Sequence, residues 1–384
     1  MKLLFFSSPA TLVLLPLLVG SLVYCALVIA AARRYRAERP PKLRNPEPVS
    51  ILKPLSGADE GLEENLRSFF TQQYSGPFEI LFAVRAASDP AIPIVRKLQA
   101  ELPHIPTDLY ITGEPPCPNA KVFSLACMLS RARHDLLVMS DSDIRVTPSM
   151  LATIAAEFQN DRLGVATCPY RAVPGRSLWS RLEAAGMNTE FLSGILVARM
   201  LEGMKFAVGP TITARRRAIE AIGGFDSLKD YLAEDFMLGK LAVDAGFGVI
   251  LSSYIIDHRI GSQSLHVNFR HRLRWARSTR RSRPAGYVGQ LFTNPLPLAL
   301  MLWVVEPAWW PLFVCALLLR AAAAFCVAVG LLRDPLVQQQ WWLVPFQDLL
   351  SFVFWIAGFF GNTIVWRGRT YYLYRDGRFA PIER

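Results

Sequence analysis

An uncharged apolar run, Pro9–Ala31, constrains this chain more than any other feature. At about 23 residues it is long enough to cross a hydrocarbon core roughly 30 Å thick. A cleaved signal peptide would need basic residues before the run and a shorter apolar core. Only Lys2 precedes it, whereas six basic residues follow it: Arg33, Arg34, Arg36, Arg39, Lys42 and Arg44. The pattern predicts an uncleaved transmembrane anchor over residues 9–31, with its C-terminal end in the cytoplasm.

More apolar stretches lie near the other end of the chain, followed by a basic tail. Residues 309–332 and 342–365 are each long enough to span, whereas 291–306 is shorter and ends at a Glu-Pro pair. The tail, 366–384, carries Arg367, Arg369, Arg375, Arg378 and Arg384. Cytoplasmic segments are rich in Lys and Arg, so the tail is predicted to be cytoplasmic. We therefore predict two transmembrane helices, 309–332 and 342–365, after an interfacial or re-entrant segment at 291–306.

This topology places Arg320 in the middle of a predicted span. A charge at that depth is costly. We expect Arg320 to snorkel, to pair with a helix neighbour such as Glu306, or to line a cavity for a lipid acceptor.

Between the membrane segments, residues 48–285 have the pattern of a globular domain. Strands are predicted at Pro48–Leu55, Phe78–Val84, Thr107–Thr112 and Asp135–Asp143, with helical patterns between them. Wholly apolar strands that alternate with helices predict an α/β fold with a mostly parallel, helix-covered sheet. In such sheets, ligands bind beyond the carboxyl ends of the strands.

Two carboxylates, Asp141 and Asp143, come at the end of the last predicted strand. Two residues apart in an extended chain, they point to the same side. At a strand end they suit a hard divalent cation, Mg²⁺ or Mn²⁺, bound together with substrate phosphates. The alternative is a capped turn, in which Asp and Ser are ordinary residues.

Three further charged side chains stand at predicted helix starts. Asp89 follows a strand and either caps the next helix or contacts the base or ribose of a nucleotide. Lys121 begins a helix, where the helix dipole disfavours a cation unless a diphosphate binds. Asp235 follows Glu234 in a first helical turn, where acidic residues are common, and is a candidate general base for a hydroxyl nucleophile.

An arginine-rich run extends from Arg270 to Arg283. Four of its arginines recur at helical spacing and share a face: Arg270, Arg274, Arg277 and Arg281. The run predicts a membrane-surface helix that contacts anionic headgroups, a diphosphate clamp, or both on different residues.

These residues fall in an ordered set of motifs. They are KPLSG (Lys53–Gly57), SDPAI (Ser88–Ile92), NAKVFSL (Asn119–Leu125), DSDIRV (Asp141–Val146), AEDF (Ala233–Phe236) and the Arg-Trp pair Arg274-Trp275. In this set the chain resembles inverting glycosyltransferases of the GT-A type. It is most similar to the ceramide glucosyltransferase family, and within it to bacterial hopanoid-biosynthesis glycosyltransferases. The resemblance covers nearly the whole chain and implies a Rossmann-like GT-A domain joined to transmembrane helices.

The resemblance also implies a role for each motif. Asp235 would be the catalytic base, and Asp141 and Asp143 would hold the metal. The nucleotide sugar would be bound by Lys53, Asp89, Lys121, Asp141, Arg274 and Trp275.

Two positions differ from relatives of this kind. The last family motif usually begins with Gln or Arg three residues before the Arg-Trp pair, where this chain has His271. Animal ceramide glucosyltransferases carry glycine where Asp143 stands, so the complete Asp-x-Asp pair favours a metal here.

The expected activity is transfer of N-acetylglucosamine from UDP-N-acetylglucosamine to bacteriohopanetetrol, with inversion; the alternative is glucose transfer from UDP-glucose to ceramide. The expected location is the bacterial cytoplasmic membrane, with several spans and a cytoplasmic catalytic domain. Despite a net charge of +11, no nucleic-acid partner is expected, because the basic residues cluster beside apolar segments. A transporter is the remaining alternative, supported only by Arg320 and Glu306.

Overall fold

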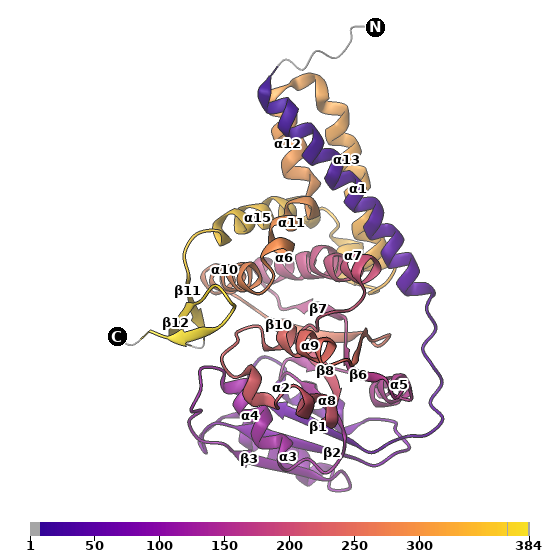
Figure 1. Ribbon diagram of the computed structural model, residues 1–384, viewed down its shortest axis with the longest axis vertical. Coiled ribbons are helices and arrows are strands. Elements are labelled where there is room, and N and C mark those ends of the chain that lie inside the picture. The colour runs from indigo at the N-terminus through magenta and orange to yellow at the C-terminus, as the bar shows by residue number, and fades with distance from the viewer. Residues whose placement is uncertain (1–7, 367, 383–384) are drawn as a thin grey trace. The chain divides into compact units, whose positions relative to one another are not determined.

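The computed structural model describes residues 8–366 and 368–382, so Lys2, Arg367 and Arg384 lie outside it (Figure 1). The chain divides into two units. A sheet unit comprises Arg39–Gly175, Glu202–Ser262 and Thr363–Arg384, and a helical unit comprises Met1–Glu38, Arg176–Leu201 and Gln263–Asn362. The division differs from the single domain predicted at 48–285. Residues 176–201 leave that range for the helical unit, and the C-terminal tail joins the sheet unit.

A seven-stranded sheet forms the centre of the sheet unit, in the order β3-β2-β1-β4-β8-β6-β9. Its strands are β1 Val49–Pro54, β2 Phe78–Val84, β3 Thr107–Ile111, β4 Leu136–Ser140, β6 Leu163–Thr167, β8 Thr211–Arg215 and β9 Gly248–Leu251. The first four are parallel, whereas β8 runs antiparallel to both of its neighbours. The predicted α/β fold with a mostly parallel sheet is therefore confirmed.

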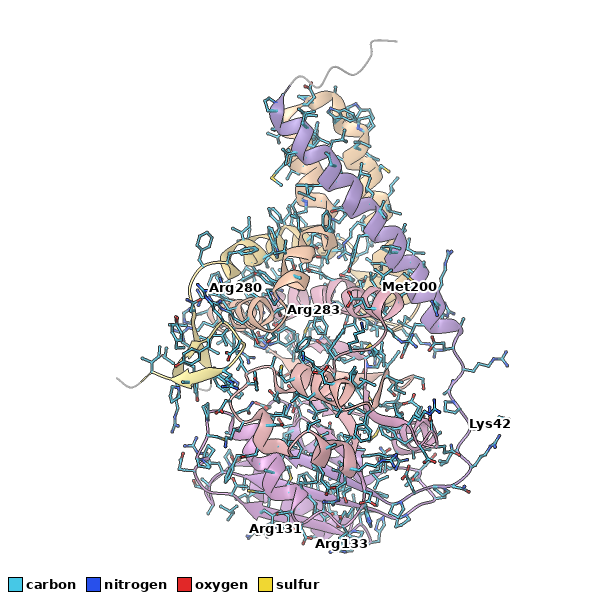
Figure 2. All side chains as sticks on the ribbon, viewed as in Figure 1. Lys42, Arg131, Arg133, Met200, Arg280 and Arg283 are labelled. Atoms are coloured by element: carbon cyan, nitrogen blue, oxygen red, sulfur yellow. The ribbon has the colours of Figure 1, made fainter. Side chains whose placement is uncertain are left out.

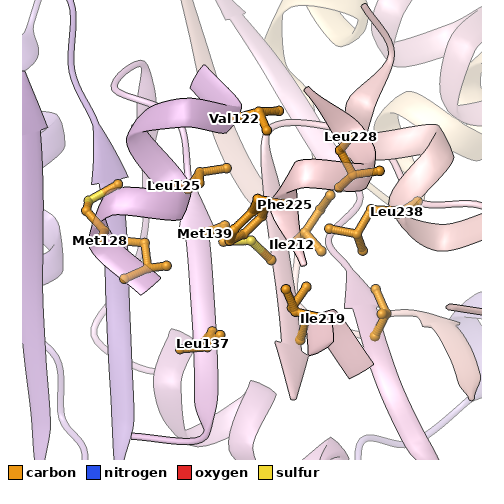
Figure 3. Close-up of a cluster of buried hydrophobic side chains, with 14 of the residues drawn as sticks. Val122, Leu125, Met128, Leu137, Met139, Ile212, Ile219, Phe225, Leu228 and Leu238 are labelled. Atoms are coloured by element: carbon orange, nitrogen blue, oxygen red, sulfur yellow. The ribbon is translucent and has the colours of Figure 1, made fainter. Parts of the chain in front are cut away.

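Helices cover this sheet because each buries one apolar face against it. They are α2 Leu62–Phe70, α3 Ala91–Glu101, α4 Ala120–Leu129, α5 Met150–Glu157, α8 Arg216–Ala221 and α9 Glu234–Asp244, with a short 3₁₀ turn, η2, at Phe225–Leu228. Figure 3 shows one such interface, where Val122 and Leu125 of α4 gather with Met139 of β4 around Phe225. This packing fixes where α4 begins relative to the end of β4.

Two smaller sheets complete the sheet unit. One has the order β5-β10-β7, from β5 Ile144–Arg145, β7 Tyr170–Pro174 and β10 Ile256–Gly261. The other is an antiparallel meander of β11 Thr363–Trp366, β12 Arg369–Leu373 and β13 Phe379–Pro381.

The helical unit contains the apolar segments. Its elements are α1 Pro9–Ala37, α6 Leu178–Gly186, η1 Met187–Phe191, α7 Leu192–Glu202, α10 Leu265–Ser282, α11 Pro284–Gly289, η3 Gln290–Thr293, α12 Pro295–Val305, η4 Pro307–Trp309, α13 Trp310–Ala324, η5 Phe325–Val329, α14 Pro335–Gln339 and α15 Leu343–Gly358. Within the described residues, α1 and the stretch Pro307–Val329 are long and apolar enough to cross a membrane. The pair Pro284–Thr293 and Pro295–Val305 passes the same test together, with a bend of 60° between its parts.

The helix that accompanies α1 and α13 is α12, whose residues were expected to be interfacial or re-entrant. Leu18 of α1, Leu296 and Ala299 of α12 and Ala316 of α13 share one buried apolar cluster. The predicted span at 342–365 is shorter than expected. Only 16 of its residues are helical, in α15, and Thr363 already begins β11.

Guanidinium groups of α10 bind the carbonyl oxygens at the C-terminal end of α15. Arg280 donates to the carbonyl oxygens of Phe359 and, at 2.8 Å, Gly361, and Arg277 donates to that of Phe360 at 3.0 Å. Cations at a helix C-terminus satisfy carbonyls that have no partner within the helix. Arg280 and Arg283 lie in and just after α10 (Figure 2). Part of the arginine-rich run therefore has a structural role that the sequence interpretation did not include.

The partner of Arg320 is Asp348 of α15 rather than Glu306. Two nitrogens of Arg320 lie 2.8 Å from the two carboxylate oxygens of Asp348, and both residues are buried. Arg320 also donates to the hydroxyl oxygen of Thr189 at 3.1 Å. This bidentate pair ties α13 to α15.

We predict that Asp348→Asn lowers the free energy of unfolding by about 3–5 kcal/mol, because it leaves the Arg320 charge buried without a counter-ion. Thermal unfolding of the full chain in detergent measures the loss. The double variant Arg320→Met/Asp348→Leu removes both charges and should be closer to wild type than the single variant. An Asp348→Asn protein as stable as wild type would contradict this assignment.

Candidate active site

Asp141 and Asp143 lie directly after β4, at the carboxyl end of the parallel strands. The amide of Asp141 donates to the carbonyl of Pro210 at 3.0 Å, next to β8. The loop after β1 approaches as well, because Ser142 donates its hydroxyl to Asp59 at 3.3 Å. The acidic pair is thus held by β4 itself, by a backbone contact beside β8 and by a side-chain contact from the loop after β1.

Lys53 of β1 lies next to this pair and is fully buried. Its ammonium donates to the carbonyl oxygen of Asp141 at 2.5 Å and lies 3.8 Å from the centre of the Phe69 ring. Burial lowers the pKa of Lys53 to about 7, although the charges of Asp141 and Asp143 act in the opposite direction. Lys53 therefore supports the acidic pair by holding the backbone carbonyl of Asp141.

Lys121 joins the acidic pair to a second helix. Its ammonium lies 2.7 Å from Asp141 Oδ1 and 3.1 Å from Glu234 Oε1. Burial lowers the pKa of Lys121, but these two carboxylates outweigh that effect and raise it. The cation at the start of α4 is thus compensated by carboxylates from β4 and α9.

Asn119 also joins the N-termini of α4 and α9. Its side-chain oxygen caps α4 by accepting from the amides of Lys121 and Val122. Its side-chain nitrogen donates to the carbonyl of Tyr231 at 2.9 Å and to Glu234 at 3.2 Å. The N-termini of α4 and α9 are therefore held together by a side chain that the sequence interpretation did not single out.

Asp235 lies beside Glu234 in the first turn of α9, close to Gly209. Burial, followed by the negative charge of Glu234, raises the pKa of Asp235 to about 7, while Lys121 works against the rise. A carboxylate with a pKa near the working pH can accept a proton efficiently from a hydroxyl group. This environment would suit Asp235 to accept a proton from a hydroxyl group.

Asp143 has a partner that the sequence interpretation missed. Nε2 of His258, on β10, lies 3.0 Å from Asp143 Oδ2. Burial would raise the pKa of Asp143, but the charge of His258 and this hydrogen bond hold it below its ordinary value. His258 is 115 residues away in the chain, and its strand pattern gives no local indication of the contact.

The other oxygen, Asp143 Oδ1, is buried and has no hydrogen-bond partner in the described part of the chain. Nowhere in the described part of the chain do three His, Cys, Asp or Glu side chains form a group that could enclose a metal ion. A divalent cation that is shared with substrate phosphates needs only one or two protein carboxylates. The unpartnered oxygen of Asp143 beside Asp141 fits that requirement.

Asp89 connects two loops at the same edge of the sheet. Its carboxylate accepts from the amide of Gly57, at 3.1 and 3.2 Å, and from that of Ala91 at 2.9 Å. It therefore holds the loop after β1 against the first turn of α3. The expected helix contact is present together with a loop contact.

Arg274 and Trp275 belong to α10 of the helical unit. The Trp275 ring packs against His271, with ring centres 5.1 Å apart, and against Phe191. His271 Nδ1 lies 2.6 Å from the buried carboxylate of Glu183. His271 is thus fixed by an acidic side chain and an aromatic ring of its own unit.

The fold is of the GT-A type. A mannosyltransferase from Pyrobaculum calidifontis, solved with GDP-Man and Mn²⁺, has a similar fold. The TM-score is 0.54 and the sequence identity 17%, over 90% of this chain and 98% of that one.

The chain belongs to glycosyl transferase family 21, whose profile matches residues 13–379. Ceramide glucosyltransferase 1 of Caenorhabditis elegans is 30% identical over 208 residues, which cover 54% of this chain and 44% of that protein. Ceramide glucosyltransferase 3 of the same organism is 25% identical over 230 residues, or 60% of this chain and 50% of that protein. The chain thus matches half or less of the length of these relatives. The expected resemblance to the ceramide glucosyltransferase family is confirmed.

We predict that kcat/KM rises with pH through an acidic limb near pH 7, because Asp235 must lose its proton before it can act as a base. In Glu234→Gln the limb should move to lower pH, since removing a neighbouring negative charge lowers the pKa of Asp235. Asp244→Asn, in the last turn of the same helix, should leave the limb in place. An unmoved limb in Glu234→Gln would contradict the predicted coupling.

A second prediction concerns Gly209. A Cβ atom at this position would lie 2.9 Å from Asp235 Oδ2, so Gly209→Ala must displace the carboxylate. We expect kcat to fall about 10- to 100-fold, since a base displaced by about 1 Å loses its alignment with the acceptor. The control is Gly289→Ala, because an added Cβ there meets open space among the described residues. Steady-state kinetics of both variants measure the effect, and an unchanged kcat in Gly209→Ala would disprove it.

Proposed function

We propose that the chain transfers a sugar from a nucleotide-sugar donor to a lipid hydroxyl group, with inversion at the anomeric carbon. The observation that carries the proposal is the placement of Lys121 between Asp141 and Glu234. This placement joins the acidic pair after β4 to the helix turn that bears Asp235. An inverting transferase needs both parts in one site, a stabilised leaving diphosphate and a base for the acceptor.

On the donor side, Asp141 and Asp143 would hold Mg²⁺ or Mn²⁺, with His258 orienting Asp143. When bound, the cation would neutralise charge on the departing diphosphate. Lys121 would turn from Asp141 toward the same diphosphate, and Asp89 would contact the nucleoside. The Mn²⁺ and GDP-Man in the Pyrobaculum mannosyltransferase are consistent with this arrangement. Lys53 would act indirectly, through the Asp141 carbonyl.

On the acceptor side, Asp235 would accept the hydroxyl proton as the lipid oxygen attacks the anomeric carbon. The bond between that carbon and the diphosphate oxygen breaks, and its electron pair leaves with the nucleoside diphosphate. Attack from the face opposite the leaving group inverts the configuration. Arg274 and Trp275 would hold the diphosphate and the lipid acceptor.

The lipid nature of the acceptor is supported by the helical unit. α1 would anchor the chain. The bent pair Pro284–Thr293 and Pro295–Val305 would cross the membrane as one broken span, and Pro307–Val329 would return across it. Helices α10 and α15 would lie at the membrane surface. This arrangement keeps the catalytic residues and the C-terminus in the cytoplasm. A bacterial cytoplasmic membrane is the proposed location.

For the substrates we favour UDP-N-acetylglucosamine and bacteriohopanetetrol. The second candidate is UDP-glucose with ceramide, and the similarity to the Caenorhabditis elegans ceramide glucosyltransferases supports it. Purified protein tested with each donor and each lipid distinguishes the two. UDP-dependent thermal stabilisation that EDTA abolishes would support the metal at Asp141 and Asp143.

The central test is Asp235→Asn, which removes the proposed base without changing the size of the side chain. We predict a loss of kcat of about 10²- to 10⁴-fold, the usual contribution of general base catalysis. Nucleotide-induced stabilisation should persist in this variant, because the donor ligands lie on β4 and α4. Asp244→Asn, on the same helix, is the matched control. Wild-type turnover by a folded Asp235→Asn protein would refute the assignment.

A further inference from the structure

The C-terminal meander, β11 to β13, is built into the sheet unit and is not a free tail. Its buried side chains Ile364, Tyr371, Leu373 and Phe379 form an apolar cluster with Leu232. Phe379 is only 2% exposed, and its ring centre lies 5.0 Å from that of Tyr371. This shared apolar cluster holds the meander against the loop that contains Leu232.

Leu232 belongs to residues 229–233, the loop directly before Asp235, which we call the base loop. The meander binds this loop through its backbone as well. The amide of Phe379 donates to the carbonyl of Asp230 at 2.9 Å, and that of Leu232 to the carbonyl of Gly377 at 3.5 Å. Asp230 and Leu232 are therefore paired with the start of β13 and with the turn that precedes it.

Side chains extend the same contact. Tyr231 pairs with Arg378 in an antiparallel bridge, and the Arg378 guanidinium lies 5.6 Å from the centre of the Tyr231 ring. On its other side, the base loop is held by Asn119, which donates from its backbone to Lys229 at 3.2 Å and from its side chain to Tyr231. The loop is clamped between the meander and the start of α4.

The start of α9 depends on this clamp. Ala233 occupies the N-cap position, and no side-chain cap is present there in the described structure. A helix start without a capping side chain is fixed by the chain that leads into it. The base loop therefore sets the position of Glu234 and Asp235.

We infer that the C-terminal meander is a positioning element of the active site, which aligns Asp235 by clamping the base loop. The inference depends on the proposed role of Asp235 as the base. It gives the tail a part in turnover rather than only in stability. Because the donor ligands Asp141 and Asp143 are fixed by β1, β4 and β8, the meander should affect the acceptor step and leave donor binding unchanged.

The test uses the full chain with Phe379→Ala, which removes the ring that packs on Leu232. We expect kcat to fall about 10- to 100-fold, with the donor KM within about threefold of wild type. Phe379→Leu should recover most of the turnover. The matched control is Tyr374→Ala, because Tyr374 lies in the same meander but is exposed and should leave kcat unchanged. Each variant is assayed below its own melting temperature, so that unfolding does not contribute to the measured change in kcat.

A double-mutant cycle adds a second measurement. If both residues act through one clamp, Leu232→Ala/Phe379→Ala should lose little more turnover than either single variant. Fully additive losses, an unchanged kcat in Phe379→Ala, or a rise in donor KM that matches the fall in kcat would overturn the inference. Asp235→Asn separates the two proposals. If it keeps its activity, both are wrong, whereas if it is inactive and Phe379→Ala is fully active, only the role of the meander is wrong.

Discussion

The ion pairs of Lys121 hold the active site together. One ammonium satisfies Asp141 from the end of β4 and Glu234 from the start of α9, which would otherwise repel each other. Without this cation, the carboxylates of Asp141, Glu234 and Asp235 would lie close together in a partly buried site with no positive charge between them. Burial, and then the nearby negative charge of Glu234, raise the pKa of Asp235, and Lys121 compensates only part of this effect.

A second group of residues fixes the first without facing the substrate. Lys53 supports the Asp141 backbone from a fully buried position, and Asn119 joins the starts of α4 and α9. Rigid support of this kind matters because a general base works only within a narrow range of positions. The C-terminal meander would extend the support to the loop before Asp235.

In the helical unit, charge serves packing as well as binding. Arg277 and Arg280 satisfy the carbonyls at the end of α15, and Arg320 forms a buried pair with Asp348. Of these three arginines, only Arg277 is on the face that the helical spacing predicted. Neither that spacing nor the apolar run around Arg320 could predict these partners, because the carbonyls and the carboxylate lie about 30 to 80 residues away in the chain.

The sequence by itself determined the apolar helices α1 and α13, the alternating strands and helices, and the placement of Asp141 at a strand end. These depend on local periodicity, which is written along the chain. Only the tertiary structure decided that His258 contacts Asp143, that α12 packs with α1 and α13, and that the tail returns to the loop before Asp235. Such contacts join residues far apart in sequence, where no periodic pattern specifies which surfaces will meet.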